Sequence, residues 1–247
     1  MNENYLYFSK GNAKLNKQTL IFDLRAGLCC PGAKDCKAMV SEQGFLIQGK
    51  DVKFRCYAAT GELRSPQARK VRTHNLNMLK GKTINKMVEI IKKSINYYTE
   101  INPEAKIIRL HSSGDFFSQN YFDAWVKVAN EMPDLKFYTY TKSLHFWTKR
   151  INDIPANLFL NASKGGLFDA LIKKFKLKCV EVVFSPEEAK KRGLETDHDD
   201  SHAFGNKNFA ILLHGTQPKN SFASKKLMEM RAIGITGYQR NKKKVAA

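Results

Sequence analysis

The stretch KIIRLHSSGD, residues 106–115, gives the first indication of the fold. Its first six residues are an apolar run with polar ends, typical of a short buried strand, and its last four form a polar loop with a glycine. The same succession of apolar run and polar loop recurs further along the chain, in KFYTYTK (136–142), NLFLNAS (157–163), KCVEVVF (178–184) and FAILLH (209–214). The sequence therefore predicts strands at these five places.

Segments with helical periodicity alternate with these strands. Apolar residues at helical spacing predict helices at 84–98, 121–129, 145–154, 167–177 and 222–233, and Ser185-Pro186-Glu187-Glu188 has the composition of a helix start. Strands that alternate with helices indicate βα units around a parallel sheet. We therefore expect an α/β protein built as a partial (β/α) barrel.

The first part of the chain reads differently. Its Gly, Pro, Asn and Lys residues predict an irregular segment at 1–82, with short strands at 5–9 and 19–24 and a hairpin-like insertion at 39–54. We expect this cysteine-containing segment to pack on the βα-repeat region, 83–247, within one structural domain.

In parallel α/β folds, functional residues gather beyond the carboxyl ends of the strands. The polar ends of the predicted strands therefore supply the candidate ligand-binding residues: Gly114, Asp115, Lys142, Ser143 and Asn161. Asp115 could bind an amino group or act as a base or nucleophile, or it could cap the following helix. Lys142 could bind a carboxylate or phosphate, or remain a solvated strand end.

Four of the five cysteines lie in the first quarter of the chain: Cys29, Cys30, Cys36 and Cys56. Clustered thiols in a reducing compartment are more often metal ligands than disulfides. We take Cys30, Cys36 and Cys56 as candidate ligands of zinc or an iron–sulfur cluster. A structural zinc would need a fourth ligand, from Cys29 or His74. The alternative is a set of buried core thiols, which is also what we expect of Cys179.

The charge of the chain favours a polyanionic partner. Lys and Arg number 42 against 23 Asp and Glu, a formal net charge of +19, which favours nucleic acid, DNA rather than RNA. A cluster of basic side chains after the third cysteine could bind the nucleic-acid backbone or form an ordinary solvated helix face: Arg64, Arg69, Lys70 and Arg72. The stretch from His198 to His202 could hold a metal, but we expect an exposed acidic loop.

No apolar run approaches the ~20 residues that a membrane-spanning helix needs, and the N-terminal stretch has no signal-peptide pattern. We therefore expect no membrane association and a cytoplasmic location, in the host cytoplasm if a phage encodes the chain.

Four phrases together resemble the phage "gene product eighty-eight" family: FRCYAATGE (54–62), IRLHSSGDFFSQNYFDAW (108–125), FYTYTKS (137–143) and LLHGTQP (212–218). The resemblance extends from about residue 30 to residue 238.

The chain also resembles, more distantly, the radical S-adenosylmethionine enzymes of the spore-photoproduct-lyase type. Cys56-Tyr57-Ala58 is similar to the last step of their cysteine motif, Gly114-Asp115 to their acidic motif, and Thr141-Lys142-Ser143 to a later Thr-Lys-Ser. This resemblance implies that Cys30, Cys36 and Cys56 bind a [4Fe–4S] cluster whose open iron binds S-adenosylmethionine. It also implies that Gly114, Asp115 and Lys142 line the cofactor pocket of a partial barrel.

The cysteine spacing differs from the compact motif of those enzymes, because nineteen residues separate Cys36 from Cys56. For the three thiols to meet, the insertion at 39–54 must loop out and return.

Three functional hypotheses follow. The first is a radical-S-adenosylmethionine-like enzyme that modifies a nucleotide base or DNA, with Asp115 and Lys142 in its active site. The second rests on a looser similarity of SSGDF (112–116) to phage guanine transglycosylases, which implies a catalytic Asp115 and a cysteine-bound structural zinc. The third is a non-enzymatic nucleic-acid-binding protein on a degenerate barrel.

Overall fold

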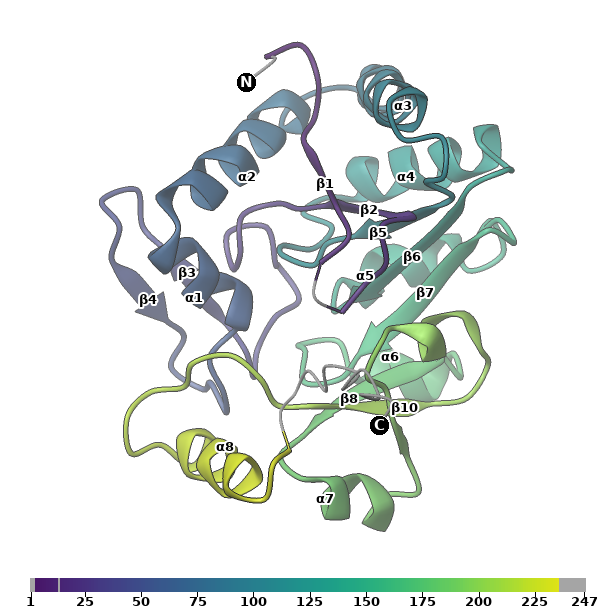
Figure 1. Ribbon diagram of the computed structural model, residues 1–247. Helices are drawn as coiled ribbons and strands as arrows, with labels where there is room; N and C mark the ends of the chain where they lie inside the picture. Colours follow the sequence, from purple (N-terminus) through teal and green to yellow (C-terminus); the bar gives the residue numbers. More distant parts are fainter. Residues whose placement is uncertain (1–2, 13, 236–247) are drawn as a thin grey trace, which may run out of the picture.

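The computed structural model describes residues 3–12 and 14–235 (Figure 1). Its main element is an eight-stranded sheet in the order β1-β2-β5-β6-β7-β8-β10-β9. The strands are β1 Phe8–Lys10, β2 Thr19–Phe22, β5 Ile107–Leu110, β6 Lys136–Thr141, β7 Leu158–Ser163, β8 Cys179–Val183, β9 Glu195–Thr196 and β10 Phe209–Leu212. All neighbouring pairs are parallel except β1 with β2. Because β1 and β9 are edge strands, the barrel is partial, as the sequence predicts.

Seven helices lie between strands along the chain: α1 Tyr57–Arg64, α2 Pro66–Leu79, α3 Ile84–Glu100, α4 Gln119–Glu131, α5 Leu144–Trp147, α6 Ala170–Lys174 and α7 Pro186–Lys191. Among the residues described, α8 Phe222–Ala232 follows the last strand. Several helices begin at a side chain that accepts a hydrogen bond from the first turn. Thr83 does so for α3, Ser118 for α4 and Ser185 for α7. These caps fix where the chain leaves each loop.

The two faces of the sheet have different composition, because side chains alternate along each strand. Ile108 and Leu110 of β5 and Phe137 of β6 belong to the main apolar core, where they are fully buried with α3 and α4. The residues that alternate with these along β5 and β6 point to the other face and are polar or amphipathic: Arg109, Tyr138 and Tyr140. The interior of the partial barrel therefore combines these polar and aromatic side chains with apolar ones such as Ile211 and Leu212.

The first part of the chain is more regular than the sequence suggests. Residues 57–79 form α1 and α2, where we expected irregular structure. Few apolar residues mark α2, since only Asn75, Leu76 and Leu79 are buried in it, and its periodicity is correspondingly weak. The strand β2 lies within the main sheet and pairs with β5. The expected insertion at 39–54 contains the hairpin of β3 Ala38–Val40 and β4 Leu46–Gln48.

Two further expectations change in detail. The helix expected at 145–154 is one turn of α5 followed by a 3₁₀ turn, Thr148–Arg150. The two-residue strand β9 and a 3₁₀ helix at Ser201–Phe204 were not expected. Among the residues described, no helix has both the length and the apolar character to span a bilayer.

Candidate functional site

Six of the predicted site residues line one pocket at the carboxyl ends of the parallel strands: Cys30, Cys36, Cys56, Gly114, Asp115 and Lys142. Its volume is about 170 Å³. One part, which we call the thiol end, is formed by Cys30, Cys36 and Cys56, with Gly114, Asp115 and Lys142 beside them. A second part lies further along the barrel interior, and we call it the floor: Lys14, Arg109, Tyr140, Asp197 and Asp200.

Cys30 and Cys36 are positioned by a loop that starts where β2 ends. The amide of Asp35 donates to the carbonyl of Gly165 at 2.9 Å, and the amide of Leu167 donates to the carbonyl of Gly32 at 2.9 Å. A Cβ atom at Gly32 would lie 2.1 Å from the carbonyl oxygen of Lys142, so only glycine fits there. The loop is thereby held by its backbone against the ends of β6 and β7.

Cys56 comes to the same pocket by a different route. The chain leaves Cys36, forms the β3–β4 hairpin and returns just before α1, which begins after Cys56. The amide of Arg55 donates to Oε1 of Gln217 at 2.7 Å. The Tyr57 hydroxyl donates to the carbonyl of Ser112, and its ring packs on His214 at 4.5 Å. The hairpin therefore accommodates the nineteen residues between Cys36 and Cys56.

Burial and mutual charge both act on the thiols. Burial raises the pKa of Cys30 well above its usual value, and the charges of Asp115, Cys56 and Cys36 raise it further. Burial and the neighbouring Cys36 raise the pKa of Cys56 to about 11, against the opposing effect of two backbone amides and of Lys142. Three thiols near enough to repel one another as thiolates would be stabilised by a cationic group between them.

Asp115 holds the loops of the pocket together. Its Oδ1 accepts from the amide of Phe116 at 2.7 Å and from the hydroxyl of Thr141 at 2.6 Å, and its Oδ2 accepts from the amide of Lys142 at 2.8 Å. Burial raises its pKa. Ser118, not Asp115, caps the following helix. The carboxylate thus orients Lys142, whose ammonium donates to Ser163.

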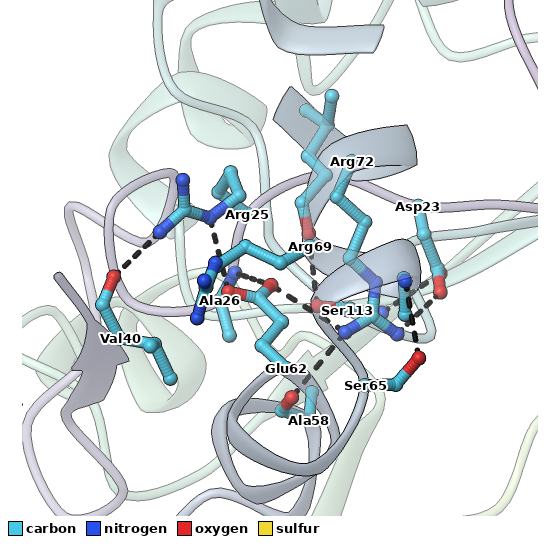
Figure 2. Close-up of polar contacts among 12 residues, drawn as sticks. Asp23, Arg25, Ala26, Val40, Ala58, Glu62, Ser65, Arg69, Arg72 and Ser113 are labelled. Carbon is cyan, nitrogen blue, oxygen red and sulfur yellow. Dashed lines mark hydrogen bonds and ion pairs between the residues drawn. The ribbon is translucent and has the colours of Figure 1, made fainter. Parts of the chain in front are cut away.

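A largely buried ion-pair network connects the chain after β2 with α1 and α2 (Figure 2). Glu62 is fully buried and accepts from the amide of Ala26 at 2.7 Å and from Nε of Arg25 at 3.0 Å. Arg72 joins Glu62 to Asp23, and Oδ1 of Asp23 accepts from the amide of Ser113 at 2.9 Å. The network therefore ties the start of the cysteine loop to the residues before Gly114.

Other candidates lie outside the pocket. Ser143 is buried and donates to the carbonyl of Phe116, and Asn161 donates to the carbonyls of Thr139 and Ala203. Cys29 belongs to the apolar core, and His74 contacts the carbonyl of Tyr5. Neither proposed fourth zinc ligand lines the pocket. Cys179 is buried in the core, as expected.

The basic cluster divides into two kinds of residue. The Arg72 guanidinium is paired inside the protein with Asp23 and Glu62, so it is not available to a nucleic-acid backbone. Arg64 and Lys70 are exposed, and Arg64 donates to the hydroxyl of Thr216. The nucleic-acid-binding cluster predicted on α1 and α2 therefore loses Arg72.

The floor was missed by the sequence reasoning. Asp200, expected in an exposed acidic loop, is 2% exposed and pairs with Lys14 at 2.5 Å and with Arg109 at 2.9 Å. Burial acts to raise the pKa of Asp200, but these two cations hold it below its usual value. No local signal identifies the pairing, because the partners lie far away in the sequence.

The placement of the possible metal ligands bears on the zinc expected from the sequence. Within residues 3–12 and 14–235, no three or more His, Cys, Asp or Glu side chains are placed to hold one metal ion. A structural zinc needs four ligands around one ion. An iron–sulfur cluster instead receives its thiolates on separate iron atoms. The described residues therefore show no four-ligand zinc arrangement, and a cluster on Cys30, Cys36 and Cys56 stays a prediction.

Comparison with known proteins places the chain in a phage family. The family model described as Gene product 88 matches residues 6–231. The Gene 88 proteins of Mycobacterium phages L5 and D29 are 27% and 26% identical to the chain over 144 residues, which is 56% of this chain and 54% of each relative. The chain thus spans about half the length of these curated relatives. No solved structure matches it significantly.

Proposed function

The chain belongs to the Gene product 88 family, and from that premise we propose that it is an enzyme of the radical-S-adenosylmethionine type. In this proposal Cys30, Cys36 and Cys56 hold a [4Fe–4S] cluster, and the substrate is a nucleotide base, free or within DNA. When bound, such a centre supplies the electron for reductive cleavage of S-adenosylmethionine.

The observation that carries the proposal is the meeting of three thiols at the carboxyl end of a partial (β/α) barrel. They come from the two sides of a hairpin and line one pocket with Gly114 and Lys142. Their mutual charge, together with burial, disfavours the free thiolate forms, so a cationic centre would relieve it.

The residues beside the thiols have supporting roles in this proposal. Gly114 lines the pocket with φ of +85°, and a Cβ atom there would lie 2.7 Å from Cβ of Leu24, so glycine lets this wall of the pocket pack against the chain that follows β2. Lys142 places a cation near Cys56, where it favours the thiolate needed for iron binding. The buried carboxylate of Asp115 positions Lys142 through its backbone amide, so we assign Asp115 a positioning role.

The base-exchange alternative is less well supported by the same residues. A nucleophilic or basic carboxylate needs a free oxygen directed at the substrate. Both oxygens of Asp115 already accept from Phe116, Thr141 and Lys142. The zinc staple of that alternative lacks its four-ligand arrangement among residues 3–12 and 14–235.

Anaerobic metal analysis tests the proposal. The purified protein should be brown and contain about four irons per chain. Cys30→Ser, Cys36→Ser and Cys56→Ser should each lose most of the iron, whereas Cys179→Ser, a matched change in the core, should keep it. With a strong reductant, the wild-type protein should release 5′-deoxyadenosine from S-adenosylmethionine.

Two results would overturn this assignment. One is a colourless protein that holds zinc, or no metal, after anaerobic purification and iron–sulfide reconstitution. The other is full iron content in all three pocket-cysteine variants, since the iron would then bind elsewhere.

A further inference from the structure

The charges of the floor balance one another. Lys14 and Arg109 both pair with Asp200, and Asp197 lies in the same wall of the pocket. Two cations and two carboxylates leave no net charge at this end. Because a buried ionic group is costly without a partner, a ligand portion that reaches the floor is expected to be neutral.

Three polar atoms of the floor are shielded from solvent and have no hydrogen-bond partner among residues 3–12 and 14–235: the Tyr140 hydroxyl, Oδ2 of Asp197 and Nε of Arg109. The Asp197 side chain is 0% exposed. Buried polar atoms without partners are uncommon, and each calls for an explanation. Here all three residues line one pocket, so a bound ligand explains them together.

The residues that carry these three atoms are close enough to influence one another's charge. Burial raises the pKa of Tyr140, and the charges of Asp200 and Asp197 raise it further, whereas Arg109 opposes this. The Arg109 guanidinium lies 5.5 Å from the centre of the Tyr140 ring. The unpartnered acceptor and donors therefore belong to one cluster.

The chemistry of the cluster restricts the ligand. A carboxylate oxygen accepts a hydrogen bond, an arginine Nε donates one, and a phenol can do either. The neighbouring walls are apolar, formed by Ile211 and Leu212 with the Tyr140 ring. Such a site fits a flat, neutral group that has an N–H donor next to an acceptor.

We infer that the floor binds a nucleobase-like heterocycle, with an N–H directed at Asp197 and an acceptor directed at Tyr140 or Arg109. This inference rests on the proposed function for the reaction that the base undergoes, but its binding can be tested without that reaction. The balanced charge leaves phosphate groups outside the floor.

Equilibrium binding to the anaerobically purified protein tests the inference. The probes are guanosine, adenosine, cytidine and thymidine, their 5′-monophosphates, and a short single-stranded DNA. We expect at least one nucleoside to bind, with its monophosphate within about threefold in affinity, because the floor has no unpaired cation for phosphate. Tighter binding of the DNA than of the nucleoside would identify a base within a strand as the source, and equal binding a free nucleoside.

The variants separate the floor from the rest of the pocket. Asp197→Asn should weaken nucleoside binding about tenfold or more, and Tyr140→Phe about threefold to tenfold, because each removes one hydrogen bond. Asp134→Asn, the same change at an exposed residue outside this pocket, should leave binding unchanged. Circular dichroism and a thermal melt confirm that each variant is folded.

Several results would overturn the inference: no nucleoside binding at millimolar concentration, unchanged affinity in both floor variants, or a monophosphate that binds more than about tenfold tighter than its nucleoside. The two proposals fail separately. Nucleoside binding that persists in iron-free Cys56→Ser supports the floor site even if the cluster is lost. An iron-loaded protein that binds no nucleoside keeps the cluster and removes the floor site.

Discussion

The thiol end and the floor are two parts of one pocket with opposite electrostatic character. At the thiol end, burial and the neighbouring thiols raise the pKa values of Cys30 and Cys56, and Lys142 is the cation that opposes this for Cys56. At the floor, Lys14 and Arg109 already neutralise Asp200. The thiol end is thus suited to a cationic group and the floor to a neutral one.

The two ends also differ in how the chain builds them. The thiol end is assembled from loops that follow strand ends, and backbone hydrogen bonds fix those loops. The floor takes Arg109 and Tyr140 from within β5 and β6, where the alternation of the strand directs them inward. In α/β folds, functional residues are commonly carried on loops that a rigid sheet positions.

The largest expected effect comes from breaking the charge balance of the floor. Asp200→Asn leaves two buried cations without their partner, and we expect the free energy of unfolding to fall by about 3–5 kcal/mol in a urea titration. Asn tolerates the left-handed backbone that Asp200 adopts, with φ of +64°. Asp134→Asn, the same change at an exposed residue outside the pocket, should change stability by less than about 0.5 kcal/mol. A loss below about 1 kcal/mol in Asp200→Asn would mean that Lys14 and Arg109 do not depend on Asp200 for charge compensation.

A smaller effect concerns His111, which lies at the end of β5 and lines the pocket. Burial lowers its pKa to about 3, against the opposing charge of Asp23. Below about pH 6.5 the imidazole therefore binds a proton in the unfolded chain but stays neutral in the folded protein. The stability from this group is complete above about pH 6.5 and declines as the pH falls towards about 3, by at most ~1.4 kcal/mol per pH unit.

His111→Asn keeps a residue that tolerates the positive φ of this position, +62°. Its unfolding free energy should depend less on pH between about 6.5 and 4 than that of the wild type. Parallel curves for the two proteins would show that folding does not shift the pKa of His111, and the interior at this point would then be more polar than we describe.

The smallest effect tests the thiol end. In metal-free protein, the alkylation rate of Cys56, followed by peptide mass spectrometry, should rise ~tenfold per unit between roughly pH 7.5 and 9.5, because only the thiolate reacts. Lys142→Met should slow the reaction several-fold at a fixed pH by raising the pKa of Cys56 further. Lys149→Met, which removes an exposed cation, serves as the control. A rate that does not depend on pH would mean that the thiolate is already formed.

The sequence predicted the regions where local pattern is strong. The apolar runs of β5, β6, β7, β8 and β10 marked the parallel sheet, and the cysteine phrases marked the thiol end. The helix α2 was missed because it buries few apolar side chains. Asp200 read as part of a surface loop, since its acidic neighbours are visible in the sequence whereas its pairing with Lys14 and Arg109 depends on tertiary structure.

Gly32 has a consequence for how the site responds to change. Its backbone lies so close to the Lys142 carbonyl that any side chain would lever the cysteine loop away from the strand ends. A Gly32→Ala protein would keep every sulfur and every ligand-facing residue and still lose their alignment. The pocket is therefore preorganised. The conformational entropy of the cysteine loop is lost when the chain folds, so ligand binding does not carry that cost.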